Sequence, residues 1–394
     1  MKQQPIVIVF DDLYPGGLFT LNRRLWRAYK KRYKGNIIVI AGIGFDQHLY
    51  TDTFSFADTH YTYQVPRINQ VCIFFLVFFH TLKLLGNTPK EAMIVVNNAF
   101  SGLAAALFCL ITHRKCVYFY HGSLHKEMES LGHPTTTMVL KIRRFAMSLF
   151  YWTIQRLTLL ISEPVCFSPY AQSLIKKHFG VTANTEVLPV PFSYMPATLQ
   201  DKSDARRSLG FAEKSRIILF PSRIEPRKGL HILIQAINLL HDKNLLLVVT
   251  GPLHGESVEY LTSLTQYDSF HAHKRIYLTG EVNPNGMHLY YKAADVTIVP
   301  SIRLEMLGLV TLESLSYGTP VIGFPSGHTP NILESINKKL VAKQIDPQSL
   351  ARTIRSFFKF SRTQKTAIEK QTERYFDTHH SQEESLKELQ RILS

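Results

Sequence analysis

Short apolar segments of β-forming residues alternate with helical patterns along almost the whole chain of 394 residues. Most of these segments are continuously apolar rather than alternating, which is typical of strands that are buried on both faces of a parallel sheet. Their spacing of about 20–30 residues, with helices between them, indicates βαβ units. The expected strands are 6–10, 36–41, 93–97, 116–120, 165–168, 187–190, 216–220, 245–250, 275–279, 296–300 and 320–324.

A polar break at 200–214 divides the strands into two series. The chain is also too long for one ordinary hydrophobic core, so two domains are expected. The sequence therefore predicts an α/β protein with two doubly wound, Rossmann-like domains, residues 1–190 and 191–375. The last segment, 376–394, contains a charged helical pattern with a leucine stripe, and we expect it to pack back on the N-terminal domain.

The formal net charge of +15 is concentrated in the first half of the chain. Residues 1–190 hold 20 Lys and Arg against 10 Asp and Glu, and the basic residues are densest between Arg23 and Lys34. Such a patch suits an anionic membrane surface, an acidic ligand or nucleic acid, and the alternative is a solvated helix face. Nearby aromatic residues, together with 143–151, favour docking on an anionic membrane; they are Trp26, Tyr29 and Tyr33. No recognition-helix or aromatic-platform pattern supports nucleic-acid binding.

The cysteines and the N-terminus suggest a cytoplasmic location. The four cysteines form no Cys-x-x-Cys pair, so we expect buried free thiols in a reducing compartment. Residues 1–10 lead directly into a strand without a signal-peptide pattern. The most lipid-like run, Val71–Phe79, has nine apolar residues, far short of the roughly 20 that span a bilayer. Peripheral attachment to the inner face of a membrane fits these observations.

Two glutamates follow the expected strand 296–300, with seven residues between them. They are Glu305 and Glu313, and Gly308 lies between them, where we expect a helix to begin. The first-turn N–H groups of a helix lack partners and attract anions, while carboxylates accept hydrogen bonds from paired hydroxyl groups. The stretch therefore suits an anionic, hydroxyl-rich ligand such as a nucleotide sugar. The alternative is an ordinary helix start whose dipole favours acidic residues.

Two cations lie five residues apart in the loop after the strand 216–220. Arg223 can make a forked contact to phosphate, and Lys228 supplies a compact charge. Cations fixed at this place stabilise a diphosphate as it leaves a sugar, and they do so more in the transition state than in the ground state. The alternative is a basic surface loop.

Three further candidates follow strands of the N-terminal half. Gly16 and Gly17 could turn backbone amides toward a phosphate, although Gly-Gly is also common in plain turns. His121 could hydrogen-bond a sugar hydroxyl or move a proton. Asp11 and Asp12 are neighbours that point apart on an extended chain, and no third ligand is evident, so we predict no metal site there.

From about Ile217 to Ile332 the chain resembles the family 4 retaining glycosyltransferases with the GT-B fold, also called glycosyl transferases group 1. The resemblance rests on the order and spacing of several short elements, and it is fainter in the N-terminal half, at Gly16-Gly17, His121 and Ser168. One departure is the turn at 327–331, where the family often reads Gly-Gly-x-x-Glu and this chain reads Gly-His-Thr-Pro-Asn. The elements are Arg223…Lys228-Gly229, Thr250-Gly251, Thr279-Gly280, Tyr291–Val296, Pro300-Ser301, the Glu305…Glu313 pair and Gly318–Ile322.

The resemblance implies two domains that face each other across a cleft, with the acceptor bound by the N-terminal domain and the nucleotide sugar by the C-terminal domain. It implies no cofactor and no metal, because the cations and the helix start replace one. The residues with implied roles are Glu305 and His121 at the transferred sugar; Leu307, Gly308 and Leu309, whose amides lie against its hydroxyls and the diphosphate; Arg223, Lys228, Gly16 and Gly17 around the diphosphate; Glu313 at the ribose; and Glu281 and Val282 beside the base.

The implied reaction is the transfer of a hexosyl group from a UDP- or GDP-sugar to a glycan or lipid-linked acceptor, with retention of the anomeric configuration. Such a reaction belongs to polysaccharide or cell-envelope glycan synthesis. Three alternatives stay open on the sequence alone. They are a GT-B epimerase or phosphorylase, a catalytically inactive GT-B-like protein that binds or regulates, and a nucleic-acid binder suggested only by charge.

Overall fold

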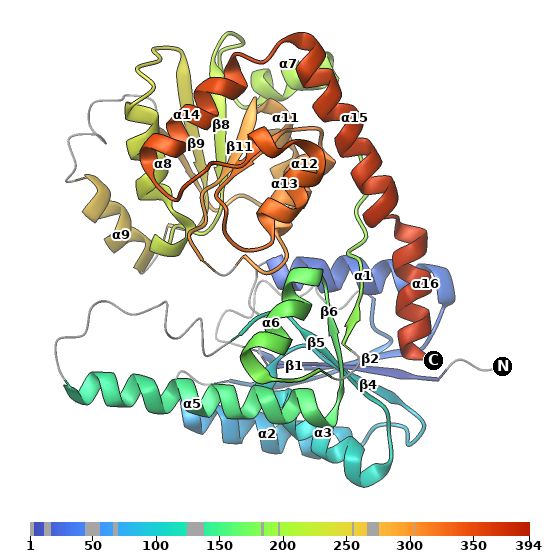
Figure 1. Cartoon of the computed structure of the whole chain (residues 1–394). Helices are drawn as coiled ribbons and strands as arrows, with labels where there is room; N and C mark the ends of the chain where they lie inside the picture. Colours follow the sequence, from blue (N-terminus) through green and yellow to red (C-terminus); the bar gives the residue numbers. More distant parts are fainter. Residues whose placement is uncertain are drawn as a thin grey trace. The chain divides into compact units, whose positions relative to one another are not determined.

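The computed structural model describes residues 4–11, 17–43, 56–65, 70–123, 138–182, 185–195, 198–253, 256–265, 276–303 and 305–394. The chain divides into two compact units (Figure 1). Unit 1 consists of Met1–Pro191 and Gln382–Ser394, and unit 2 is Phe192–Ser381. The last helix therefore belongs with the N-terminal half of the chain.

Unit 1 is built on a parallel sheet of seven strands in the order β3-β2-β1-β4-β5-β6-β7. The central strand β1 is completely buried, as its unbroken apolar sequence predicts. The strands are β1 (Ile6–Phe10), β2 (Ile37–Ile43), β3 (Thr59–Gln64), β4 (Met93–Val96), β5 (Cys116–Tyr120), β6 (Glu163–Cys166) and β7 (Glu186–Val187).

Helices cover both faces of this sheet. On one side α2 (Gln70–Leu85), α3 (Ala99–Thr112) and α5 (Met138–Ile161) lie together, with α3 in contact with the other two (Figure 1). On the other side α1 (Gly17–Tyr33) packs against the C-terminal helix α16 (Gln382–Leu393), and the Tyr29 hydroxyl donates to Gln390 Oε1 at 2.8 Å. Helix α6 (Pro169–Phe179) follows β6.

Unit 2 contains a parallel sheet of five strands in the order β10-β9-β8-β11-β12. Its strands are β8 (Arg216–Pro221), β9 (Leu245–Thr250), β10 (Ile276–Gly280), β11 (Val296–Val299) and β12 (Val321–Gly323). Its helices are α7 (Leu199–Ser208), α8 (Leu230–Asn238), α9 (Glu256–Thr265), α11 (Met287–Ala293), α12 (Leu309–Ser316), α13 (Thr329–Asn337), α14 (Pro347–Phe358) and α15 (Arg362–His379), with short 3₁₀ turns η2 (Pro226–Lys228) and η3 (Lys338–Leu340).

Both sheets have the doubly wound strand order, in which the first strand is central and the chain winds outward to one edge before it crosses to the other side. The direction reverses between β1 and β4 in unit 1 and between β8 and β11 in unit 2. Ligands of such sheets bind in the crevice beyond the carboxyl ends of the strands at this switch point. In unit 2, the residues that follow β8 and β11 carry the predicted Lys228 and Glu305.

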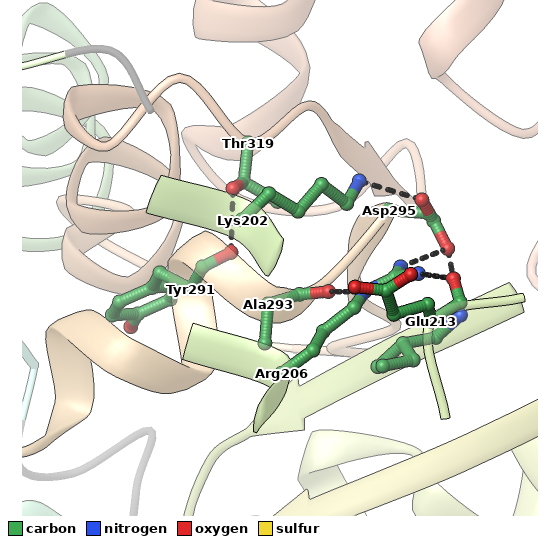
Figure 2. A network of polar contacts seen from close by, with 8 residues as sticks. Lys202, Arg206, Glu213, Tyr291, Ala293, Asp295 and Thr319 are labelled. Atoms are coloured by element: carbon green, nitrogen blue, oxygen red, sulfur yellow. Dashed lines mark hydrogen bonds and ion pairs between the residues drawn. The ribbon is translucent and has the colours of Figure 1, made fainter. Parts of the chain in front are cut away.

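A polar network fastens β8 to β11 at their opposite, amino ends (Figure 2). The carboxylate of Asp295, just before β11, accepts from the backbone N–H of Ile217 at 2.8 Å and from Arg206 Nη2 at 2.9 Å. Its other oxygen accepts from Lys202 Nζ at 2.6 Å. Arg206 also donates from Nε to the carbonyl of Ala293 at 3.0 Å, so this buried guanidinium ties α7 to the segment before β11.

Every expected strand overlaps an observed one, but the sequence missed β3. Its residues, THYTYQ, are mostly polar and exposed, because β3 is an edge strand that pairs only with β2. A search for continuous apolar runs cannot find such a strand.

Two expectations about side-chain burial were wrong. Cys109, Cys116 and Cys166 are buried free thiols as predicted, but Cys72 is exposed on α2. Trp26 is completely buried against the core of unit 1, so it cannot face a membrane. Within the described residues, no helix is both long and apolar enough to cross a membrane.

Candidate functional site

The loop after β8 is pressed closely against the segment after β11. Gly229 has a left-handed φ of 76°, and a Cβ atom there would lie 2.0 Å from the carbonyl oxygen of Pro300, so only glycine fits. The backbone N–H of Ile302 also donates to the carbonyl of Arg227 at 2.9 Å. These contacts place Lys228, at the end of η2, beside the residues that follow β11.

Lys228 and Glu305 form an ion pair at this switch point. Their Nζ and Oε2 atoms are 2.8 Å apart, and only 12% and 11% of the two side chains are exposed. Ser301 donates from Oγ to the same carboxylate oxygen at 3.0 Å. Burial alone would raise the pKa of Glu305, but the charge of Lys228 and the hydrogen bonds from Lys228 and Ser301 outweigh it, so the pKa is lowered. Glu305 is therefore a carboxylate at neutral pH.

A third loop, after β12, supports the backbone of Glu305. The N–H of His328 donates to the carbonyl of Glu305 at 2.7 Å. A Cβ atom on Gly327 would lie 2.5 Å from that same carbonyl oxygen, and φ at Gly327 is 70°. In the sequence this turn stands out only as a departure from the family pattern, and no role was predicted for Ser301, although glycine in a turn and serine at a strand end were visible signals.

The helix start predicted near Gly308 is confirmed. Gly308 is the N-cap of α12 with φ of 70°, and Leu309 is the first helical residue. The first-turn N–H groups of α12 have no partner within the helix, as in every α-helix. Leu307 lies between this cap and Glu305. The helix therefore begins four residues after the buried carboxylate.

Glu313 lies in the second turn of α12, where its half-buried carboxylate accepts from the hydroxyl of Tyr291 at 3.0 Å. Glu281 and Val282 follow β10, beyond the carboxyl end of the strand, and Glu281 is exposed. The carboxyl ends of β9 and β10 are joined by the N–H of Gly251, which donates to Gly280 at 3.0 Å. These residues share the strand-end edge of the sheet with the ion pair.

Arg223, which we expected to contact a diphosphate, forms an ion pair with Glu225 in this structure. Its Nη1 lies 2.8 Å from Oε1 of Glu225, and Arg227 Nε lies 2.8 Å from the other oxygen of that carboxylate. The side chain of Arg223 is 52% exposed. An ion pair so accessible to water contributes only about 0–1 kcal/mol, so an anionic ligand can compete with Glu225 for this arginine.

In unit 1, His121 follows β5 and is half-buried. Its Nε2 lies 3.3 Å from Oδ1 of Asn97, and since an amide oxygen can only accept, Nε2 carries the proton. Its ring stacks on Phe167 with centroids 5.0 Å apart. Burial lowers the pKa of His121 to about 3, so the ring is neutral at pH 7 and its Nδ1 is an acceptor.

The other candidates of the N-terminal half are the Gly16-Gly17 turn and the neighbours Asp11 and Asp12. Gly16 and Asp12 lie outside the described residues, and Gly17 is the first residue of α1. Asp11 accepts from the backbone N–H groups of Phe100 at 3.0 Å and Ser101 at 2.6 Å, so it binds the first turn of α3. Among the described residues, no three His, Cys, Asp or Glu side chains are grouped closely enough to hold a metal ion.

Residues 201–374 match the family model described as glycosyl transferases group 1. This part of the chain is similar to members of that family. Lys228, Glu305 and Glu313 all lie within the group 1 match, as do Glu281 and Val282. His121 and the Gly16-Gly17 turn lie outside it.

Curated relatives share limited stretches with this chain. An uncharacterized glycosyltransferase of Methanocaldococcus jannaschii is 33% identical over 153 residues, which are 39% of this chain and 38% of that protein. A GDP-mannose-dependent monoacylated alpha-(1-6)-phosphatidylinositol monomannoside mannosyltransferase of Corynebacterium glutamicum is 32% identical over 176 residues, which are 41% of this chain and 44% of that protein. The chain thus matches less than half of the length of these relatives.

Solved structures resemble the whole chain. Sucrose-phosphate synthase from Thermosynechococcus elongatus has a TM-score of 0.80 at 17% identity, covering 99% of this chain and 98% of that one. HepE of Anabaena in complex with UDP and glucose has a TM-score of 0.79 at 17% identity, covering 99% of each chain. The predicted fold is confirmed: the chain has the GT-B fold, with two parallel-sheet, Rossmann-like units, and the group 1 match covers most of unit 2.

Proposed function

We propose that this protein is a retaining, metal-independent glycosyltransferase that moves a hexosyl group from a UDP- or GDP-sugar to a glycan or lipid-linked acceptor. The observation that carries the proposal is the Lys228–Glu305 ion pair at the switch point of the group 1 domain. Doubly wound sheets bind nucleotides at this place, and the pair combines a cation for a diphosphate with an acceptor for hydroxyl groups.

The chemistry of the pair follows from its charges. As the bond between the sugar and the diphosphate breaks, negative charge grows on the leaving phosphate, and Lys228 is placed to stabilise it. Arg223, released from its exposed contact with Glu225, adds a forked contact to the same group. The start of α12 supplies N–H groups and the positive end of a helix dipole. Together these groups do the work that a divalent cation does elsewhere, so we assign no metal and no cofactor.

Glu305 acts as a hydrogen-bond acceptor rather than as an acid. Its lowered pKa keeps it ionised at neutral pH, so it can hold the hydroxyls of the transferred sugar but has no proton to donate. The neutral His121 is assigned to the same sugar. In the retaining mechanism implied by the family, the acceptor attacks from the front face and the leaving phosphate takes up the acceptor proton.

The remaining roles in donor binding fall on residues along the same edge of the sheet. Glu313 is assigned to the ribose hydroxyls, the amides of Leu307, Gly308 and Leu309 to the sugar and the diphosphate, and Glu281 and Val282 to the base. Both UDP and GDP stay in the proposal as the nucleotide of the donor, because HepE was solved with UDP and the mannosyltransferase relative is named for GDP-mannose. We assign the binding of the acceptor to unit 1, and the reaction to polysaccharide or cell-envelope glycan synthesis.

A panel of UDP- and GDP-sugars tests the proposal. The purified protein is incubated with each donor in EDTA, without acceptor, and released UDP or GDP is measured. Slow release from one donor is expected, with the freed sugar first appearing in the anomeric configuration of the donor by ¹H NMR. Release that requires a divalent cation would refute metal independence, and a sugar freed with the opposite configuration would refute retention. Interconversion of the donor without release would indicate an epimerase instead.

A further inference from the structure

Three helices on one side of the sheet of unit 1 contain no acidic residue. Helices α2, α3 and α5 have neither Asp nor Glu in their sequences, although they lie on the surface of the unit. They lie together, and α3 contacts the other two (Figure 1). We call their outward side, which faces away from the sheet, the α2/α3/α5 face.

Large apolar side chains project from this face into solvent. On α5, Val139 is 74% exposed and Phe145 is 71% exposed, and Ile111 at the end of α3 is 77% exposed. Phe75 and Phe79 are exposed on α2 in the same way. Single exposed apolar residues are normal, but a face that gathers many of them on adjacent helices marks an interaction surface.

Basic residues lie among these apolar residues at the start of α5. Lys141, Arg143 and Arg144 alternate with Ile142 and Phe145 in the first turns of the helix. Long basic side chains place their charge at the level of lipid headgroups while their stems and apolar neighbours enter the acyl region. An amphipathic helix that is basic and carries large apolar residues therefore suits the interface of a bilayer.

The absence of carboxylates from these three helices indicates what kind of partner the α2/α3/α5 face can bind. A second copy of this chain, packed on the same face, would bring two sets of basic residues together across helices that contain no Asp or Glu, which is unfavourable. A bilayer with anionic headgroups supplies both the apolar volume and the opposite charge. The basic residues of α1 are not needed for this contact, and its aromatic residues Trp26 and Tyr29 are buried.

We propose that the α2/α3/α5 face docks on an anionic lipid bilayer, with the first turns of α5 inserted at the headgroup level. This surface lies in unit 1 and is independent of the donor chemistry assigned to unit 2. It also gives a role to the apolar run of α2, which is too short to cross a bilayer.

Vesicle flotation tests the proposal. The intact protein is mixed with phosphatidylcholine vesicles, with or without phosphatidylglycerol, and is expected to float only with the anionic vesicles. The double variant Ile142→Glu with Phe145→Glu should bind them at least about tenfold more weakly, because two large apolar anchors are replaced by charges that the headgroups repel. Val258→Glu is the matched control, since Val258 is an exposed apolar residue of α9 in unit 2.

Several outcomes would overturn the proposal. They are the absence of flotation with anionic vesicles, flotation that the double variant retains, and a lipid-free dimer that the double variant dissociates in sedimentation analysis. The last result would identify a second copy as the occupant. Because nucleotide release reads out unit 2 without lipid, a failure of flotation beside normal release would leave the proposed donor chemistry intact.

Discussion

At the scale of single residues, the ion pair between Lys228 and Glu305 is costly for the fold. Taking two charges out of water carries a desolvation penalty that their mutual attraction does not always repay. The hydrogen bond from Ser301 and the lowered pKa of Glu305 show how the surroundings support the charged form. A buried pair beside a helix start is therefore better explained by ligand binding than by stability.

Replacement of either partner tests this explanation. Glu305→Gln and Lys228→Ala should each lower turnover at least about tenfold, because the loss of one transition-state contact costs more than ~1.4 kcal/mol. Turnover is measured with the donor found in the panel, and circular dichroism checks the fold. Lys292→Ala is the control, since Lys292 pairs with Asp201 at 3.6 Å on the surface. Near-normal turnover in both site variants would refute the assignment.

His121 should make the protein less stable in mild acid. Its pKa is about 3 in the folded chain against an ordinary value of 6.5, so below pH 6.5 the unfolded chain takes up a proton that the folded chain does not. As the pH is lowered below 6.5, the free energy of unfolding therefore decreases. The contribution of His121 to this decrease is up to about 1.4 kcal/mol per pH unit. His121→Gln should remove that share, as measured by urea unfolding between pH 7.5 and 5. Parallel stability curves for the two proteins would contradict the expectation.

At the scale of elements, most strands could be predicted because burial on both faces demands continuous apolar residues. The positions of Lys228, Glu305 and Glu281 beyond strand ends also followed from the sequence, since parallel strands bring their carboxyl ends to one edge. The contact between Lys228 and Glu305 could not be predicted, because it depends on how two loops from different strands approach each other. Gly327 was missed for the same reason, since its need for glycine comes from the backbone of Glu305 in another loop.

The network around Asp295 should be important for the stability of unit 2 and not for its chemistry. Asp295→Asn removes the charge that compensates the buried Arg206, and we expect a loss of about 2–3 kcal/mol in the free energy of unfolding. Nucleotide binding by the folded protein should stay unchanged, because the network lies at the amino ends of the strands. Asp204→Asn, in an exposed pair with Arg207, is the control and should cost less than about 1 kcal/mol. An equal effect of both substitutions on unfolding would argue against this role.

At the scale of the whole molecule, two sheets with the same winding carry different surface features. Unit 2 contains the group 1 match and the ion pair, and unit 1 contains the α2/α3/α5 face. The chain passes from unit 1 to unit 2 at Pro191 and returns at Gln382. The residue at which the chain returns to unit 1 could not be predicted from the sequence, because α15 and α16 are both charged helices and neither Pro nor Gly separates them.

Calorimetric titration of UDP and of GDP in EDTA is the decisive test of the proposed donor site. One of the two nucleotides should bind the wild-type protein without metal. Lys228→Ala should weaken this binding at least about tenfold, since a charge-assisted phosphate contact is lost. The Lys292→Ala control should bind as the wild type does. If neither nucleotide bound, or if Lys228→Ala bound normally, the donor site would not be at the switch point of unit 2.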